Sequence, residues 1–116
     1  MADSNSSLVK DVRKVEDATV VTLSGDVDLH QSPALHAALV QVAGDRPKRL
    51  VLDLSAVPYI DSSGIGTFVE VFLRVKSYKG KMIFFGLSDR VRCVFEITKL
   101  DKFFTICQNE ADAVRA

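Results

Sequence analysis

The sequence has few cysteines, no excess of charge of either sign and no long hydrophobic run, and each absence excludes a class of protein. Its 116 residues contain two cysteines, Cys93 and Cys107, at a separation that fits no metal-binding spacing. Lys+Arg and Asp+Glu both number 15, so there is no basic field for nucleic acid or anionic lipid. No apolar run approaches the roughly 18 residues of a membrane span, and Met1–Ser7 lacks the charged and apolar regions of a signal peptide. We therefore expect a cytoplasmic protein that does not insert into membranes, with both cysteines reduced and packed as small buried residues.

Motifs for the common catalytic chemistries are also missing. The only histidines are His30 and His36, and Ser63 does not lie in a Gly-x-Ser-x-Gly sequence, so acyl transfer lacks a positioned base. No glycine-rich phosphate loop is present. The best candidate ligands for magnesium are four aspartates, Asp26, Asp28, Asp53 and Asp61. Turn and helix-capping roles explain these aspartates more simply, so we expect no metal site, no cofactor and no enzymatic activity.

Strand and helix patterns alternate along the chain. Residues 1–7 are small and polar without periodicity, which predicts a mobile tail before a single domain at residues 8–116. The expected strands lie around Val9–Val15 and at 18–24, 50–54, 82–85 and 103–106, and the expected helices begin near Ser32, Ser62, Ser88 and Asn109. The first two strands form a hairpin that turns near Glu16-Asp17, while the later crossovers favour parallel pairing. The fold class is therefore α/β, a single domain with a mixed β-sheet and helices packed mainly on one side, with the strand order left open.

The stretch from Leu50 to Gly66 joins a strand, a turn and a helix start. Leu50 to Leu54 is an apolar run typical of a strand buried on both faces. The polar cluster at 61–64 then precedes a periodic segment, so a helix should begin at about Ser62. At 100° per residue, Ser63 falls on an outward stripe, whereas Ser62 falls nearer the apolar half and should act as a cap.

The rest of that outward stripe consists of Thr67, Glu70, Arg74 and Ser77. Gly64 and Gly66 lie beside it, and each weakens a helix by roughly 1 kcal/mol relative to alanine. This cost indicates close approach by another chain at the start of the helix. A plain helix cap remains the simpler interpretation of the polar cluster taken alone.

The motif Asp61-Ser62-Ser63-Gly64-Ile65-Gly66, after a Leu-Asp-Leu strand, resembles the signature of STAS domains, specifically the bacterial anti-sigma factor antagonists. The turn at 24–28, Ser-Gly-Asp-Val-Asp, resembles the turn that ends a strand in this family, and Val91 to Asp101 resembles its third helix and following turn. The order of elements matches from about Val9 to Val114. One departure is Lys99, where the family often has glycine.

The resemblance implies a STAS-like fold and a phosphorylation-switched binding module. When unphosphorylated, such a protein sequesters a serine-kinase anti-sigma factor and so frees a sigma factor, and a serine phosphatase reverses the modification. The kinase would use ATP and magnesium, whereas this chain would need no cofactor of its own. Ser63, the second serine of the motif, would accept the phosphate. The expected partner surface comprises Asp26, Asp28, Asp61, Ser62, Gly64, Gly66, Thr67, Glu70 and Arg74.

Two other functions stay open at this point. The chain could be a STAS-domain interaction subunit of another assembly, such as a cytoplasmic component of a lipid-transport ATPase, without a phosphate cycle. It could also be a small hydrolase that uses Ser63. A kinase-like partner, a transporter ATPase or turnover by the isolated chain would distinguish the three.

Overall fold

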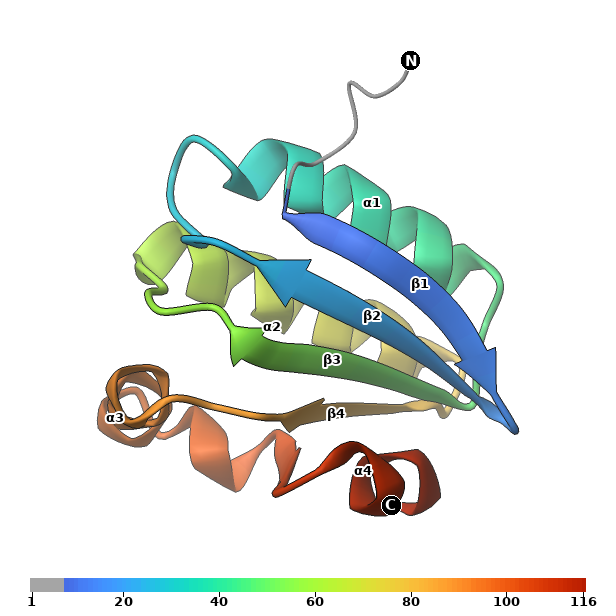
Figure 1. Cartoon of the computed structure of the whole chain (residues 1–116). Coiled ribbons are helices and arrows are strands. Elements are labelled where there is room, and N and C mark those ends of the chain that lie inside the picture. The colour runs from blue at the N-terminus through green and yellow to red at the C-terminus, as the bar shows by residue number, and fades with distance from the viewer. Residues whose placement is uncertain (1–7) are drawn as a thin grey trace.

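The computed structural model describes residues 8–116, so the mobile tail predicted over residues 1–7 lies outside it. There are five strands and four helices in this part of the chain: an opening hairpin of two strands, after which helices and the remaining three strands alternate (Figure 1). The strands are β1 (Val9–Val15), β2 (Ala18–Ser24), β3 (Arg49–Ala56), β4 (Lys81–Phe85) and β5 (Thr105–Cys107). The helices are α1 (Ser32–Gly44), α2 (Ser62–Ser77), α3 (Asp89–Ile97) and α4 (Glu110–Arg115), with a 3-10 turn η1 (Leu100–Lys102).

The sheet is mixed, as predicted, and its strands follow the order of the sequence, β1-β2-β3-β4-β5. Strands β1 and β2 pair antiparallel through the tight turn at Glu16 and Asp17, because two residues are enough to reverse the chain. The remaining pairs are parallel, and a helix makes each crossover from β2 to β3, from β3 to β4 and from β4 to β5. This order, which the sequence left open, places β1 at one edge and sets the βα units beside one another.

The helices lie mainly on one face of the sheet, as predicted. Figure 1 shows α1 and α2 side by side behind the strands. Their apolar residues, with those of α3, share one core with alternate residues of the strands, including Leu35, Phe68 and Phe95 beside Leu52 and Phe84. The short helix α4 covers the opposite face, where its residues Ala113 and Val114 pack with Val20, Val51 and Ile83.

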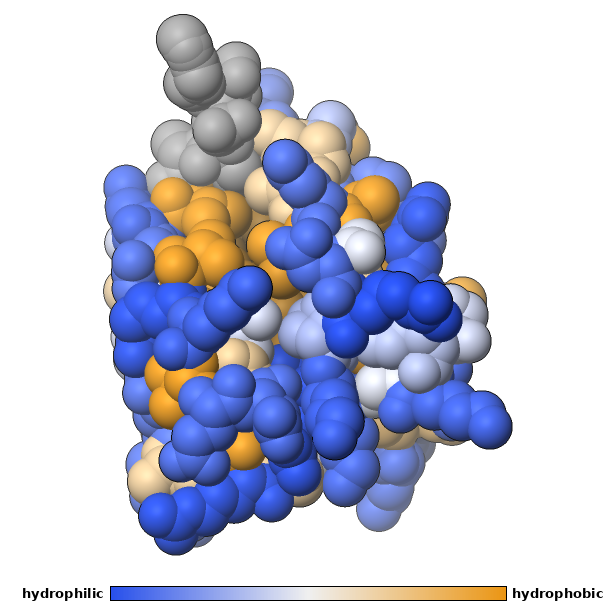
Figure 2. Space-filling model, turned by 90° about the vertical axis from the view of Figure 1, so that its right-hand side faces the viewer, coloured by the Kyte–Doolittle hydropathy of each residue, from blue (hydrophilic) through white to orange (hydrophobic). Residues whose placement is uncertain are grey.

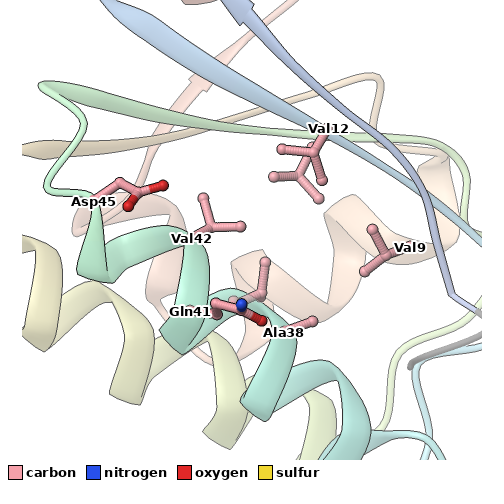
Figure 3. Close-up of a pocket in the computed structure, with 8 residues that line it drawn as sticks. Val9, Val12, Ala38, Gln41, Val42 and Asp45 are labelled. Carbon is pink, nitrogen blue, oxygen red and sulfur yellow. The ribbon is translucent and has the colours of Figure 1, made fainter. Parts of the chain in front are cut away.

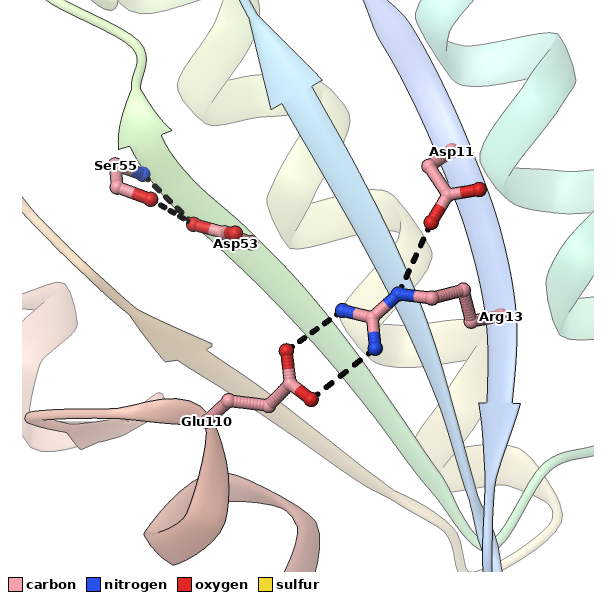
Figure 4. Close-up of polar contacts among 5 residues, drawn as sticks. All are labelled: Asp11, Arg13, Asp53, Ser55 and Glu110. Atoms are coloured by element: carbon pink, nitrogen blue, oxygen red, sulfur yellow. Dashed lines mark hydrogen bonds and ion pairs between the residues drawn. The ribbon is translucent and has the colours of Figure 1, made fainter.

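An ion pair helps to hold α4 against that second face (Figure 4). The guanidinium of Arg13 on β1 donates two hydrogen bonds to Glu110, at 3.1 Å and 2.6 Å, and its Nε lies 3.0 Å from Asp11. The hydrogen bond from Arg13 lowers the pKa of Glu110, and partial burial opposes this effect. The bidentate geometry fixes the direction of both side chains, so the edge strand and the last helix are joined across the sheet.

Three details differ from the sequence predictions. The last strand begins at Thr105 instead of Phe103, because Phe104 turns into the core while Phe103 is 67% exposed. The apolar spacing after Ser88 predicts that Thr98 lies on the buried face of α3 with Val91, Val94 and Phe95. Thr98 is instead exposed, and its hydroxyl donates to carbonyl groups of the same helix. Cys93 is exposed and Cys107 is half-buried, so the expectation that both are buried is wrong for Cys93.

Lys99 lies in the turn after α3 with a φ of 67°, in the left-handed region. Glycine adopts this conformation without the steric penalty that a Cβ brings, which explains why the resembled family favours glycine there. The chain keeps the turn with lysine, and the amide N–H groups of Lys99 and Lys102 close it on the carbonyls of Glu96 and Lys99.

The start of α2 is pressed against the segment that follows β2. Val27 forms a parallel bridge with Ile60, its N–H donates to Tyr59, and its carbonyl accepts from Asp61 at 3.1 Å. A Cβ on Gly64 would lie 2.6 Å from Cγ1 of Val27 and 2.8 Å from its carbonyl oxygen. Gly64 is therefore required by this chain's own packing, and the prediction that another chain explains it is wrong. A Cβ on Gly66 would meet nothing within 4 Å.

Phe84 is the centre of an aromatic cluster on the main core face. Its ring centroid lies 5.1 Å from that of Phe68, 5.3 Å from Phe95 and 4.8 Å from Phe104. These rings come from α2, α3 and the segment before β5, so one side chain of β4 joins three otherwise separate elements. Its deletion would leave a large cavity that rigid neighbours cannot fill.

We expect Phe84→Ala to lower the free energy of unfolding by about 3–5 kcal/mol, because a fully buried ring is lost and a cavity remains. Phe103→Ala is the matched control, and its effect should stay within about 0.5 kcal/mol since that ring is exposed. Urea denaturation of both variants measures the difference. A loss of similar size for both would contradict the assignment of Phe84 to the core and Phe103 to the surface.

The two glycines at the start of α2 should respond to alanine in opposite directions. Gly64→Ala should destabilise the fold by about 1–3 kcal/mol, because the new methyl group would overlap Val27. Gly66→Ala should stabilise it by about 0.5–1 kcal/mol, because alanine is the better helix former and the space is open. Thermal and urea unfolding of the pair tests this, and equal effects would show that helix propensity alone governs both positions.

Candidate functional site

The Asp61 carboxylate is the N-cap of α2. Its Oδ1 accepts hydrogen bonds from the backbone N–H groups of Ser63 at 2.9 Å and Gly64 at 3.1 Å. Its Oδ2 accepts from the N–H of Leu29 at 3.0 Å, in the loop between β2 and α1. The helix begins at Ser62, as predicted, but the cap is Asp61 and not Ser62. A single side chain therefore caps the helix and fixes a loop from the preceding βα unit.

Ser63 and Ser62 have the reverse of their predicted orientations. Ser62 is exposed, whereas Ser63 is half-buried, with its Oγ donating to Oδ1 of Asp61 at 2.6 Å and lying 3.0 Å from Oγ of Ser32. The two serines lie on different sides of α2, as the 100° rotation predicts. The side that was expected to face solvent at Ser63 instead faces α1. The first part of the stripe predicted to face outward lies against α1, which packs beside α2 and contacts Ser63 through Ser32. Glu70 and Arg74, further along the stripe, are exposed.

The hydrogen bond from the Ser63 hydroxyl is the main cause that lowers the pKa of Asp61. The N–H groups of Gly64, Ser63 and Leu29 add to this effect, while partial burial opposes it. The carboxylate is therefore ionised at neutral pH and acts only as an acceptor. A hydroxyl bonded to such a group is oriented by a charge-assisted hydrogen bond, which is stronger than a bond to a neutral acceptor.

Further along α2, the same stripe also meets α1. Thr67 is buried, at 7% exposure, and its hydroxyl donates to the carbonyl of Ser63 at 3.2 Å. Glu70 contacts Nε2 of His36 on α1 and lies 3.8 Å from Arg74. Glu70 and Arg74 are more than half exposed, but Thr67 and Gly64 are buried. Thr67 and Gly64, which were expected to contact a partner, therefore support the site from inside the fold.

The turn after β2 adds two aspartates to this end of the sheet. Oδ1 of Asp28 accepts from the N–H groups of His30 at 3.1 Å and Gln31 at 3.2 Å, so the carboxylate holds the entry to α1. Asp26 is exposed. The structure thus brings the turn and the start of α2 together, as expected, but Asp28 also supports the loop. A charge reversal there would disturb the fold as well as a contact.

Three residues of this region were not predicted from the sequence as part of the site. Leu29 is 70% exposed although its backbone is anchored to Asp61. Tyr59 is partly exposed, with the guanidinium of Arg90 5.9 Å from its ring centroid. Ser32 reaches Ser63 from α1. An apolar residue in a polar loop was the only available signal for Leu29, and no local pattern indicated the contact made by Ser32.

Of the four aspartates considered as magnesium ligands, Asp26 is exposed, and the other three have separate hydrogen-bonding roles. Asp53 accepts from the N–H of Ser55 at 2.9 Å and also from its hydroxyl (Figure 4). Asp28 and Asp61 accept from backbone N–H groups. Across residues 8–116, no group of three or more His, Cys, Asp or Glu side chains is placed to hold a metal ion.

A hollow of about 340 Å³ lies elsewhere, between β1 and α1 (Figure 3). It is lined by Val9, Val12, Val21, Ala38, Leu39, Gln41, Val42 and Asp45. These side chains are mostly aliphatic, and Asp45 is the one ionisable group among them. Figure 2 shows that hydrophobic residues on this side of the molecule occur in patches separated by hydrophilic ones. The chemical features therefore concentrate at the start of α2 and not in the hollow.

Within the described part of the chain, none of the helices has the length and apolar character needed to cross a membrane.

Comparisons with known proteins identify the family. The STAS domain family model matches residues 9–113. The anti-sigma-B factor antagonist of Bacillus subtilis is 32% identical over 105 residues, which cover 90% of this chain and 95% of that protein.

Solved structures share the fold. An anti-sigma factor antagonist from Mycobacterium paratuberculosis has 30% identity and a TM-score of 0.82, covering 90% of this chain and 88% of its own. The phosphorylated form of the Bacillus cell fate determinant SpoIIAA has 19% identity and a TM-score of 0.69, covering 90% of this chain and 96% of its own, and shows the likeness of the fold. With nearly its whole length matched by sequence and by structure, the chain belongs to the STAS-domain family of bacterial anti-sigma factor antagonists.

Proposed function

We propose that this chain is a cytoplasmic, phosphorylation-switched binding protein. Unmodified, it sequesters a serine-kinase anti-sigma factor and so frees a sigma factor. The kinase transfers phosphate to Ser63, and a serine phosphatase removes it. The chain itself is a substrate and a binding partner, not an enzyme.

The observation that carries this proposal is the Ser63 hydroxyl at the first turn of α2, bonded to the ionised Asp61. The anti-sigma factor antagonist relatives supply the partner class, and the phosphorylated form of SpoIIAA shows that a protein of this fold can carry the modification. An accessible helix start with Gly66 open beside it supports close docking of a partner. These features belong to one surface at the carboxyl ends of β2 and β3.

A phosphate on Ser63 would act on this surface through charge. It brings about −1.5 to −2 charges at neutral pH and removes the proton that Ser63 donates to Asp61. The dianion would then lie beside a carboxylate that is itself ionised, so the surface becomes strongly negative and hydrated. The helix dipole at the start of α2 stabilises an anion by about 0.3–1 kcal/mol, so the fold should survive. Docking should fail because a partner would have to desolvate two adjacent like charges.

The apolar part of the surface comes from Leu29 and Tyr59. Leu29 projects from a loop whose backbone is bonded to Asp61, so the exposed side chain is held next to the proposed switch. An apolar anchor beside a charged switch gives a partner both contact area and sensitivity to modification. Ser62, Gly66 and Asp26 are exposed around it and complete the surface.

Ser63, not the more exposed Ser62, should accept the phosphate. Incubation with the partner kinase and ATP, followed by fragment mass spectrometry, should place the phosphate on Ser63. Ser62→Ala should still be labelled, whereas Ser63→Ala should bind the kinase and take no label. Ser63→Asp should remain folded by circular dichroism and bind poorly. Phosphate on Ser62, or full labelling of Ser63→Ala, would contradict the assignment.

Leu29→Ala should weaken binding of the unmodified protein to the kinase by about tenfold or more, because burying a leucine side chain contributes about 1.5–3 kcal/mol. Its effect on unfolding should be small since the side chain is exposed. Val12→Ala, which shortens a half-exposed residue on β1, is the matched control and should bind normally. Isothermal titration measures both, and equal affinities for the two variants would remove Leu29 from the docking surface.

A further inference from the structure

A buried serine of α1 contacts the hydroxyl that the proposed switch would modify. Ser32, the first residue of α1, is 6% exposed. Its hydroxyl donates to the carbonyl oxygen of Asp28 at 2.8 Å, and its Oγ lies 3.0 Å from Oγ of Ser63. Because Ser63 lies in the first turn of α2, the contact between the serines joins the first turns of two neighbouring helices.

The number of protons available determines which of the two serines donates the hydrogen bond. Each hydroxyl has one proton and two lone pairs, and the ionised Asp61 can only accept, so the short contact with Asp61 takes the proton of Ser63. The contact between the serines is then a hydrogen bond only when Ser32 donates to Ser63. The same proton of Ser32 also reaches the carbonyl oxygen of Asp28, at 2.8 Å. Ser32 therefore donates in a three-centre hydrogen bond, with one branch to that carbonyl and the other to Oγ of Ser63.

We propose that Ser32 is a positioning residue for phosphoryl transfer to Ser63: its hydroxyl donates to Oγ of Ser63 and, together with Asp61, fixes the one direction from which a phosphoryl donor can reach this oxygen. The inference rests on the proposed function and concerns the regulation of the same site. Ser32 touches neither ATP nor the kinase, and it acts through Ser63.

The tetrahedral geometry of the oxygen explains this role. Of its four directions, one holds the bond to Cβ, one holds the proton given to Asp61, and one receives the proton of Ser32. The last lone pair is the only one left for attack. A nucleophile held in one orientation needs less reorganisation to reach the in-line geometry of phosphoryl transfer than a freely rotating one.

In the transfer, the bond between Oγ of Ser63 and the γ-phosphorus of ATP forms while the bond from that phosphorus to the bridging oxygen breaks. ADP leaves with that oxygen and the electron pair of the broken bond. The hydroxyl proton leaves through Asp61 to water. Ser32 keeps its own proton throughout, so it can still donate to the ester oxygen of the phosphoserine. Ser32 is then a neutral donor to the ester oxygen. Asp61 can no longer bond this oxygen, because the oxygen has lost the proton that it donated.

Ser32→Ala tests the proposal with the purified partner kinase, magnesium and ATP. Loss of one neutral hydrogen bond should lower kcat about three- to tenfold, while KM for the protein substrate stays within about twofold because Ser32 is buried. Ser32→Thr and Ser32→Val form a matched pair of equal size that differs in the hydroxyl. The threonine variant should recover most of kcat, and the valine variant should resemble Ser32→Ala. An unchanged kcat in Ser32→Ala, or equal rates for the matched pair, would overturn the proposal.

A measurement without the kinase separates this inference from the proposed function. In the unmodified protein, the Hα–Hβ couplings of Ser63 should report one rotamer, and in Ser32→Ala they should move towards averaged values. Unchanged couplings would overturn the positioning role whatever the kinase does. Wild-type protein that takes no phosphate from the kinase, with fixed couplings that average in Ser32→Ala, would instead overturn the proposed function and leave the hydrogen bond between the serines established.

Discussion

The Asp61 carboxylate is the constraint on which the arrangement of the site depends. Three backbone N–H groups and one hydroxyl converge on its two oxygens, and they come from two different βα units. Replacing this carboxylate with a group that accepts fewer hydrogen bonds would release the first turn of α2 and the loop at Leu29 together. The orientation of Ser63, the exposure of Leu29 and the approach of Val27 to Gly64 are therefore coupled through one side chain.

The contact between α1 and α2 determines which part of the second helix a partner can reach. Ser32 meets Ser63 near the start of both helices, and His36 meets Glu70 one to two turns later. The covered side of α2 is thus polar, held by side-chain hydrogen bonds, and distinct from its apolar core side. Ser62 and Gly66 remain exposed at the helix start. In the proposed function, a partner would reach the Ser63 hydroxyl from the side that α1 does not cover.

Local chemistry made most of the fold predictable. The alternation of apolar strands and amphipathic helices gave the α/β class, the opening hairpin, and the start of α2 at Ser62, because period and capping residues act over short distances. The strand order and the covered stripe of α2 depend on which helices become neighbours, and no single segment contains that information. For this reason Ser63 was placed outward and Ser62 inward, and Gly64 was assigned to a partner although Val27 of the same chain approaches it. The residue pattern indicated the start of α2, where Ser63 is bonded to Asp61, but only the tertiary structure shows the contact with Ser32.

The sequential strand order also separates the residues of the proposed recognition surface from many of those that stabilise the fold. Every side chain in the proposed recognition surface, apart from the Arg90 that lies over Tyr59, falls between Asp26 and Arg74, in the first two βα units. The part from β4 onwards supplies Phe84, Phe95 and Phe104 of the aromatic cluster, and Glu110, which pairs with Arg13 of β1. In the proposed function, a substitution from β4 onwards therefore acts mainly through the stability of the fold, whereas one in the first two βα units can also act on the contact with the partner. Stability and partner choice can then be changed separately, by substitutions in different parts of the chain.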